Sequence, residues 1–409
     1  MKNGYTTGAC AAAGVKAALL FEAGRPWQTV HLTALDGTEL TIPVKAVTQT
    51  EGGICAEVVK FSGDDPDITD GVSVFTTVRH EDGGAMTFAA GEGIGTVTKP
   101  GLSVPVGQPS INPGPRELMR RAASDVLGTS DGLHVTIAIP AGKRLAEKTL
   151  NPVLGVKGGI SVIGTTGVLR PMSEEGFKNS LVPQIDVARA AGAEELIFVP
   201  GKIGENLAKA WGLPQDRLVQ TSNFIGFMLE RAAERGIARV MLFGHIGKLS
   251  KVAAGVFYTH NRIADARLET IAAYAAAAGL STEGARRVLA SNTTEDALTV
   301  LREAGLEQAV CRAIAERASV RASRSASFFI SSTVMVSFLR RICAILAHTQ
   351  VLYNRICRNS TAILDFFRGI GYNHPCVRET HSWIGIEVVI TALTRNFGRS
   401  WEFRPPDSP

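Results

Sequence analysis

The stretch RVMLFGHIGKLSKVAAGVFYTHNRIAD, residues 239–265, places a buried strand before a glycine turn, a basic helix and a polar Thr-His-Asn cluster. Val240 to Phe243 is an apolar run of strand length, and the Ala-rich run after the turn is typical of a helix. Strand, turn and helix in this order are typical of the ligand-binding edge of an α/β fold. Unpaired N–H groups at the helix start, with Lys248 and Lys251, favour an anionic ligand, and His245 is expected at its rim.

The sequence leading to this stretch alternates strands with helices from Ser173 onward. The strand-like runs ELIFV, RLVQT and RVMLF are separated by the helix-like runs GENLAKAWG and NFIGFMLERAAERG. This alternation predicts a small parallel sheet with helices on its faces, whose ligand edge lies at the strand C-termini. The segments KIGEN (202–206) and HIGK (245–248) are both expected on that edge. The segment SEEGFKNSLVPQIDVARAAG (173–192) is interpreted as one long helix.

The first half of the chain has a different pattern, with short alternating strands between residues 29 and 88. These strands read VHLTAL, LTIPVKAV, CAEVVKF and VSVFTTVRH, and DG, GG and DDPD turns separate them. We therefore predict an α+β first domain with a mainly antiparallel sheet at residues 1–190. A small α/β domain with a parallel sheet is predicted at 191–318, followed by an atypical basic tail at 319–409.

The composition is that of a globular protein that does not cross a membrane. The 409 residues are 45% apolar, which suffices for two buried cores. No signal-peptide pattern opens the chain, and Arg340 and Arg341 interrupt its longest apolar stretch, residues 328–347. The six cysteines form no C-x-x-C pair, so a zinc or dithiol site has no support and a reducing, cytoplasmic location is expected. No protein-bound metal is predicted.

The formal net charge of +5 is unevenly distributed along the chain. Residues 1–318 hold 32 Lys plus Arg against 33 Asp plus Glu, whereas residues 319–409 hold 11 Arg, no Lys and 5 acids. The body is therefore nearly neutral and the tail is basic. The arginines of the tail are scattered among Phe, Ile and Ser rather than clustered, so binding to nucleic acid or to a membrane is not expected.

Three short motifs resemble known ligand sites only in part. GEGIGTVTKPG (91–101) has a glycine spacing that lets a backbone approach a ligand, but β-prone residues follow where a dinucleotide fingerprint needs a helix, and we favour a structural turn. GHIGKL (244–249) lacks the glycine spacing and the Ser or Thr of a phosphate loop, which argues against a kinase or NTPase. DDPD (64–67), with Asp70, carries carboxylates that suit Mg²⁺, but Asp and Pro are ordinary turn formers and a turn is favoured.

Two other segments carry polar groups that suit an anionic ligand. The loop 151–180 is rich in glycine, and Arg170 lies there just before a helix that Ser173 can cap. The N-terminal GYTTGAC (4–10) offers a second helix start capped by a threonine. His245 and His260 are candidate bases because histidine titrates near neutrality, against the alternative that each is a structural hydrogen-bonding residue.

Seven blocks in a fixed order together resemble one protein family. They are GYTTGACAAAGVKAAL, KFSGDDPDITDG, GEGIGTVTKPGL, INPGPRELM, NPVLGVKGGISVIGTTGVLRPMSEE, PGKIGENLAKAWG and FGHIGKLSKVAAGVFYTHNRIADARLE. From about residue 2 to about residue 318, the chain resembles the cobalt-precorrin-5B (C-1)-methyltransferase family (CbiD-like) of anaerobic cobalamin synthesis. None of the blocks is a mechanistic motif by itself.

The resemblance implies methylation of cobalt-precorrin-5B at C-1 by S-adenosylmethionine to give cobalt-precorrin-6A, and a fold of two domains. The substrate is then an anionic cobalt corrinoid that carries its own cobalt, and its size suits a cleft between domains. Methyl transfer from a sulfonium needs in-line positioning more than an acid or base, so the absence of a catalytic triad is expected. The alternative is a non-catalytic tetrapyrrole carrier, and a homo-oligomer is compatible with either reading.

The resemblance and the residue patterns together give three groups of candidate site residues. The candidates for catalysis or proton handling are His245, His260 and Asp265. The candidates for binding S-adenosylmethionine are Gly201, Gly204, Glu205, Asn206, Gly244 and Gly247, ahead of Gly91, Glu92, Gly93 and Gly95. The candidates for binding the macrocycle are Thr6, Thr7, Lys99, Thr165, Thr166, Arg170, Lys248, Lys251 and Asn261.

The tail from Ser319 to Pro409 departs from the pattern of the family. Lysine disappears there, and three of the six cysteines lie in it, at 343, 357 and 376. An extra domain, a disordered arm and a chain read out of frame are the three interpretations. We favour the last, because the composition changes inside what the resemblance implies is the final helix.

Overall fold

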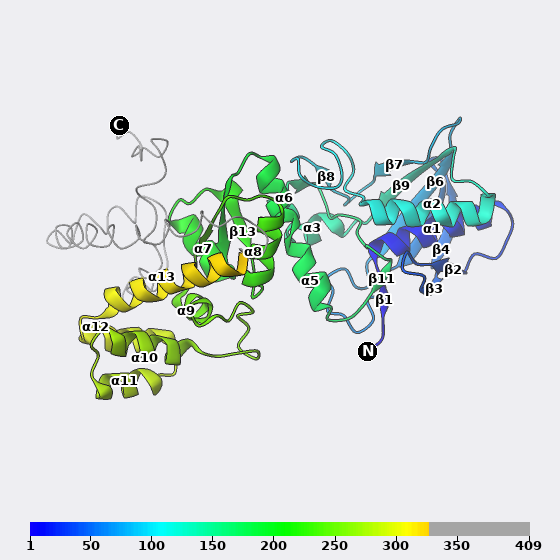
Figure 1. Cartoon of the computed structure of the whole chain (residues 1–409). Coiled ribbons are helices and arrows are strands. Elements are labelled where there is room, and N and C mark those ends of the chain that lie inside the picture. The colour runs from blue at the N-terminus through cyan, green and yellow to red at the C-terminus, as the bar shows by residue number, and fades with distance from the viewer. Residues whose placement is uncertain (327–409) are drawn as a thin grey trace, which may run out of the picture. The chain divides into compact units, whose positions relative to one another are not determined.

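The structure is a computed structural model that describes residues 1–326 and combines helices with strands (Figure 1). Contacts between Cα atoms divide the chain into two compact units, with the boundary between Ala191 and Gly192. Residues 327–409, which make up most of the tail, lie outside the described residues, so the interpretation of the tail stays a prediction. Its first residues, 319–326, continue the last described helix. Within residues 1–326, no helix is both long and apolar enough to cross a membrane.

The first unit contains a five-stranded sheet of order β4-β5-β6-β9-β7. Its strands are β4 Ala46–Thr50, β5 Gly53–Val59, β6 Ser73–His80, β7 Thr87–Ala90 and β9 Leu133–Ala138. Three of the pairings are antiparallel, but β7 runs parallel to β9, so the sheet is mixed. The mixture arises because β9 inserts between β6 and β7, which follow one another along the chain.

The predicted strand LTIPVKAV is in fact two strands that belong to different sheets. β2 Thr29–Thr33 and β3 Glu39–Pro43 form a separate antiparallel hairpin, whereas β4 joins the five-stranded sheet. The break follows Pro43, which has no N–H group to continue the ladder. The chain then joins the next sheet through the hydrogen bond from Lys45 N to Glu57 O.

Two helices cover this sheet and run side by side (Figure 1). They are α1 Thr7–Glu22 and α2 Pro113–Leu127. α1 packs on α2 and on the strands β5 and β6, and all of its residues except Lys16, Phe21 and Glu22 are buried. Its small Ala and Gly side chains permit this close packing on all sides. The core of the first unit therefore lies around α1.

Short elements complete the first unit. Two short antiparallel pairs are β1 Gly4–Tyr5 with β11 Val168–Leu169, and β8 Thr96–Val97 with β10 Val156–Lys157. The remaining helices are α3 Gly142–Ala146, α4 Asn151–Leu154, α5 Glu174–Leu181 and α6 Pro183–Ala190. The single helix expected over 173–192 is wrong, because it breaks at Val182. Pro183 has no N–H for the helical ladder and instead begins α6.

The second unit contains a parallel three-stranded sheet of order β13-β12-β14, as the alternation of strands and helices predicts. Its strands are β12 Glu195–Val199, β13 Leu218–Gln220 and β14 Arg239–Leu242. The helices that follow these strands are α7 Lys202–Ala210, α8 Ile225–Glu234 and α9 Ile246–Ala254. A short 3-10 turn, η1 Gln215–Arg217, precedes β13.

Four further helices follow the sheet of the second unit. They are α10 Arg267–Ala277, α11 Thr282–Leu289, α12 Thr294–Glu303 and α13 Glu307–Ala326. α13 packs against α8 and α9, and α10 packs against α9. α10 and α13 therefore pack around α9, the helix that follows β14. The domain limits predicted at residues 190 and 318 stay predictions.

Candidate functional site

The order of the three parallel strands defines a topological switch point in the second unit. β12 comes first along the chain and lies in the centre, and β13 and β14 flank it on opposite sides. The chain thus moves one way through α7 and then back across the sheet through α8. Because such crossovers are right-handed, α7 and α8 belong to opposite faces. In sheets of this kind ligands bind at the carboxyl ends of the strands where the direction reverses, here between β12 and β14.

The loops that follow β12 and β14 lie side by side at this edge. A Cβ atom on Gly204 would lie 3.2 Å from the carbonyl oxygen of Phe243, and one on Gly244 would lie 2.9 Å from Cδ of Pro200. The structure therefore brings together the loops that contain the two predicted segments, 202–206 and 245–248. Gly201, with φ of 107°, begins α7 in a conformation that L side chains rarely adopt.

The start of α7 is open, unlike the starts of the neighbouring helices. Gly201 provides no side-chain cap, and no described residue accepts a hydrogen bond from the N–H groups of residues 202–204. In contrast, the side chain of His245 caps α9, and Gly226 N in α8 donates to Phe257 O. Because the positive end of the helix dipole coincides with these N–H groups, the start of α7 suits an anionic group.

Glu205 lies in the first turn of α7 and is bound inside the protein. Its side chain is 6% exposed and accepts hydrogen bonds from Lys202, Lys209 and Gln220. Burial raises the pKa of this carboxyl, but the hydrogen bonds from Lys209 and Lys202 outweigh it, and the pKa is lowered overall. Glu205 therefore fastens α7 to the end of β13, whereas its neighbour Asn206 is exposed.

The lowered pKa of Glu205 predicts a pH-dependent contribution to stability. The contribution is complete above the unfolded pKa of about 4.3 and is lost as the pH falls through the lower folded pKa. We expect Glu205→Gln to reduce the free energy of unfolding by about 1 kcal/mol at pH 7, and by less at pH 3, which lies below the unfolded pKa. Urea denaturation at both pH values measures it. Glu194→Gln is the control, because Glu194 is 82% exposed and should show no such difference. An equal loss at both pH values contradicts the prediction.

His245 occupies the N-cap position of α9. Its Nδ1 accepts the N–H of Gly247 at 3.1 Å, and its Nε2 is hydrogen-bonded to Glu295 in α12. An Nδ1 that accepts carries no proton, so the neutral ring has its proton on Nε2. Its basic nitrogen is therefore occupied by the backbone, and the ring serves as a cap and as a link to α12.

His260, like His245, accepts a hydrogen bond from the backbone N–H of the residue two positions later in the chain. Its Nδ1 accepts the N–H of Arg262 at 3.1 Å, and its ring lies edge-on to Tyr258. The neutral ring therefore carries its proton on Nε2, which can donate to a ligand. Asp265 is paired with Arg267 through two hydrogen bonds of 2.6 and 2.7 Å. These bonds lower the pKa of Asp265, so this carboxylate stays charged and paired.

The two lysines of α9 point into one polar network. Lys248 donates to Asn223 Oδ1 and to the carbonyl oxygen of Thr259. Lys251 donates to the same carbonyl, to Asn261 Oδ1 and to the carbonyl of Ala264. Burial is the largest cause that lowers the pKa of each lysine.

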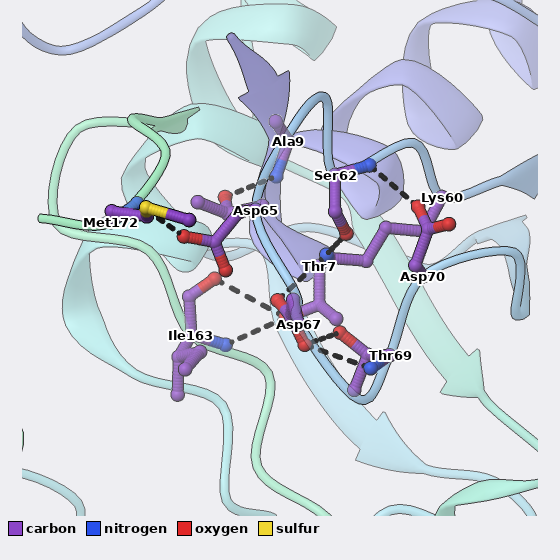
Figure 2. A network of polar contacts seen from close by, with 11 residues as sticks. Thr7, Ala9, Lys60, Ser62, Asp65, Asp67, Thr69, Asp70, Ile163 and Met172 are labelled. Carbon is purple, nitrogen blue, oxygen red and sulfur yellow. Dashed lines mark hydrogen bonds and ion pairs between the residues drawn. The ribbon is translucent and has the colours of Figure 1, made fainter. Parts of the chain in front are cut away.

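The start of α1 in the first unit is closed by the loop 161–172 (Figure 2). Thr7 Oγ1 donates to Ile163 O and accepts from Ile163 N, and Gly8 N also donates to Ile163 O. Thr6 caps the helix by accepting from Ala9 N at 3.2 Å. The N–H groups that the sequence assigns to a substrate anion are thus bound to the protein, and substrate binding by Thr6 and Thr7 stays a prediction.

The acidic segment 64–70 forms turns beside this helix start, and protein groups occupy its carboxylates (Figure 2). Asp65 accepts from Met172 N at 2.8 Å, and Asp70 accepts from Ser62 N at 2.7 Å. Asp67 is paired with the buried Lys60 at 2.9 Å. Within residues 1–326, no group of three or more His, Cys, Asp or Glu side chains is arranged to hold a metal ion.

The other predicted substrate residues lie in loops of the first unit. Lys99 donates to Val153 O at 3.1 Å, and Arg170 is paired with Asp36 at 2.9 Å. Thr166 Oγ1 accepts from Val168 N, and Thr165 is exposed. Their role in binding the macrocycle stays a prediction.

The GEGIG loop is packed tightly against neighbouring backbone. Gly91 N donates to Ile137 O and Gly95 N to Ile160 O. A Cβ on Gly93, which has φ of 77°, would lie 1.9 Å from Ile139 O. The glycines therefore permit close backbone packing, and the exposed Glu92 lies between two of them.

Sequence reasoning missed three residues that hold the site together. They are Gln220, the last residue of β13, Asn223, which follows β13 on the same edge, and Glu295, which lies 50 residues from its partner His245. Gln220 and Asn223 could have been found, because the carboxyl ends of all the parallel strands lie at the same edge of the sheet. Nothing in the local pattern links Glu295 to this edge.

Comparisons with known proteins find relatives along most of the chain. A family model described as CbiD matches residues 1–171, and one described as CbiD, C-terminal domain, matches residues 258–345. A protein of Moorella thermoacetica named cobalt-precorrin-5B C(1)-methyltransferase is 49% identical over 328 residues, covering 79% of this chain and 88% of that protein. A protein of the same name from Methanocaldococcus jannaschii is 45% identical, covering 79% and 90%. A 1.9 Å crystal structure of the cobalamin biosynthesis protein CbiD from Archaeoglobus fulgidus is 24% identical, with a TM-score of 0.34 over 65% of this chain and 84% of that chain.

Proposed function

The chain belongs to the CbiD family, and we infer that it is an enzyme that methylates cobalt-precorrin-5B at C-1 in cobalamin biosynthesis. The relatives named cobalt-precorrin-5B C(1)-methyltransferase align with most of this chain, and this chain aligns with most of the length of each relative. The product of this reaction is cobalt-precorrin-6A, and the cobalt belongs to the substrate. The protein's task is therefore to hold a large anionic macrocycle against a methyl donor.

We propose that S-adenosylmethionine is the methyl donor and that it binds at the switch point between β12 and β14. The observation that carries this placement is the open start of α7, where three N–H groups have no partner among the described residues. They suit the carboxylate of the donor's amino-acid end. When bound, S-adenosylmethionine would supply a methyl group on a sulfonium. A bond from C-1 of the macrocycle to the methyl carbon would form as the S–CH₃ bond breaks, and the electron pair of the broken bond would stay on sulfur.

Glycines at this edge leave room for a ligand close to the backbone. Gly201 has no atom within 4 Å of the position of a Cβ, whereas Gly204 and Gly244 bring the two loops together. The GEGIG loop is the second choice for the donor. Its glycines face Ile137, Ile139 and other backbone atoms, which favours the switch point over it.

The two histidines contribute by donating hydrogen bonds rather than by accepting protons. Both rings use Nδ1 to accept a backbone N–H, which leaves the proton on Nε2. Transfer of a methyl group from a sulfonium depends mainly on the distance and alignment of the reacting atoms. We therefore assign His260 to substrate contact and His245 to the support of α9.

Incubation of the protein with methyl-labelled S-adenosylmethionine and cobalt-precorrin-5B tests this function. We expect the label in the macrocycle and one S-adenosylhomocysteine formed for each methyl transferred. Cobalt-precorrin-6A, which already carries the C-1 methyl, is the control substrate and should take up no label. Tight binding of the macrocycle without transfer would instead identify a carrier protein.

A further inference from the structure

Lys251 is fully buried, and its ammonium group is bound to one short segment of the chain. Its three hydrogen bonds reach the carbonyl of Thr259 at 3.2 Å, Asn261 Oδ1 at 2.7 Å and the carbonyl of Ala264 at 2.8 Å. An ammonium group has three N–H donors, so this set leaves none for a substrate. The sequence-based role of Lys251 in contacting the macrocycle therefore gives way to a role inside the protein.

The partners of Lys251 are neutral. A buried charge without a hydrogen-bonded carboxylate costs free energy, and burial accordingly lowers the pKa of Lys251 while Asp265 opposes the shift. A hydrophobic side chain of the same length would fill the space without that cost. The hydrogen bonds of Lys251 instead fix the conformation of residues 259–264, which form neither a regular helix nor a strand.

The hydrogen bonds of Lys251 lie on both sides of His260. Thr259 precedes it and Asn261 follows it, and Thr259 is also held by Asn223 through a backbone hydrogen bond of 2.9 Å. Within residues 1–326, no hydrogen-bond partner is found for Nε2 of His260. The ring is partly exposed, so this N–H group can reach a ligand.

The charges around His260 favour an anionic ligand. Lys248 and Lys251 place two positive charges in the network that holds the segment, and Arg262 is exposed beside it. The neighbouring carboxylate of Asp265 is already paired with Arg267. A neutral N–H donor in a positive field suits a carboxylate group.

We propose that Lys251 is a positioning residue, which fixes the 259–264 segment so that Nε2–H of His260 donates to a carboxylate of the corrinoid substrate. This inference rests on the proposed function, because it takes the macrocycle as the source of the carboxylate. Lys251 acts through His260 and does not touch the substrate itself.

A double-mutant cycle of Lys251→Met and His260→Ala tests the proposal. We expect each single variant to raise KM for cobalt-precorrin-5B about tenfold and to change kcat little, since each loses one charge-assisted contact made in the bound state. The double variant should be no worse than His260→Ala alone, because Lys251 has nothing to position once the ring is gone. Multiplied losses, about 100-fold in the double variant, would overturn the proposal.

Two further variants separate positioning from loss of fold. Arg286→Met is the control, because Arg286 is 74% exposed on α11, where among the described residues it pairs only with Glu283, so KM for the macrocycle should not change. Asn261→Ala removes one of the three acceptors of Lys251 from an exposed position, which spares the fold. It should raise KM less than Lys251→Met and should also be non-additive with His260→Ala. Additivity here would count against the proposal even if Lys251→Met does not fold.

Nitrogen-15 NMR of the histidine rings tests the positioning without relying on activity. In the wild-type protein we expect His260 in the single tautomer with the proton on Nε2, and in Asn261→Ala a mixture of both tautomers. His245 is the internal control, because its contacts to Gly247 and Glu295 are untouched and its signals should not move. An unchanged His260 spectrum would overturn the positioning role. Absence of methyl transfer by the wild-type protein would instead overturn the proposed function.

Discussion

Gly93→Ala is expected to cost more than about 4 kcal/mol of the free energy of unfolding of the first unit. The new Cβ would lie 1.9 Å from the carbonyl oxygen of Ile139 and 2.8 Å from its carbon, and both are backbone atoms that cannot turn aside. The positive φ of 77° adds strain for any residue with a side chain. Urea denaturation followed by circular dichroism measures the loss, which should be large enough to populate the unfolded unit at 37 °C.

Gly107→Ala is the matched control for the glycine in the GEGIG loop. Gly107 has a similar φ of 85°, but no atom lies within 4 Å of the position of a Cβ. Its substitution should cost about 1–2 kcal/mol, from backbone strain alone. Equal losses in the two variants would show that close packing at Gly93 contributes nothing. A stable Gly93→Ala variant that fails only in binding S-adenosylmethionine would instead make the loop a donor site.

Gly204→Leu and Gly247→Leu are expected to weaken the binding of S-adenosylmethionine about 100-fold or more. A side chain on Gly204 would enter the narrow space where the loop after β12 meets Phe243, 3.2 Å from its carbonyl oxygen. A side chain on Gly247 would press on Nδ1 of His245, 3.1 Å away, and displace the cap of α9. Isothermal calorimetry of each folded variant measures the dissociation constant.

The control for this pair is Ala210→Leu, at the exposed far end of α7. It adds the larger side chain to the same helix but away from the switch point, so affinity for S-adenosylmethionine should not change. Unchanged affinity in both glycine variants would rule out this edge as the donor site. The GEGIG loop would then be the next place to examine.

The edge of the second sheet at which the loops after β12 and β14 meet could be predicted from the sequence, because its cause is local. Short apolar runs that alternate with helix-like runs require crossovers, and crossovers bring the strand C-termini to one edge. Gly204 and Gly244 accordingly meet there, although they are 40 residues apart. The mixed sheet of the first unit could not be read in this way, because the insertion of β9 between β6 and β7 is a long-range pairing.

The roles of the individual side chains were harder to predict from the sequence. A glycine-rich spacing is the same whether a backbone approaches a ligand or another backbone. The sequence GEGIG alone therefore could not distinguish a ligand-binding loop from a tightly packed turn. His260 was visible as part of the polar Thr-His-Asn cluster, but its contact with Arg262 N and its support by Lys251 depend on the fold. The break at Pro183 follows from proline chemistry that the sequence already contains.

The enclosure of α1 has a consequence for synthesis on the ribosome. This helix leaves the ribosome before the elements that bury it, which include β6 and α2, and α2 ends only at Leu127. At about 5–20 residues per second, α2 is complete roughly 5–20 s after α1. During that interval a nearly all-apolar helix lacks α2, on which it packs in the folded unit, so the nascent chain presents a target for chaperones that bind apolar segments.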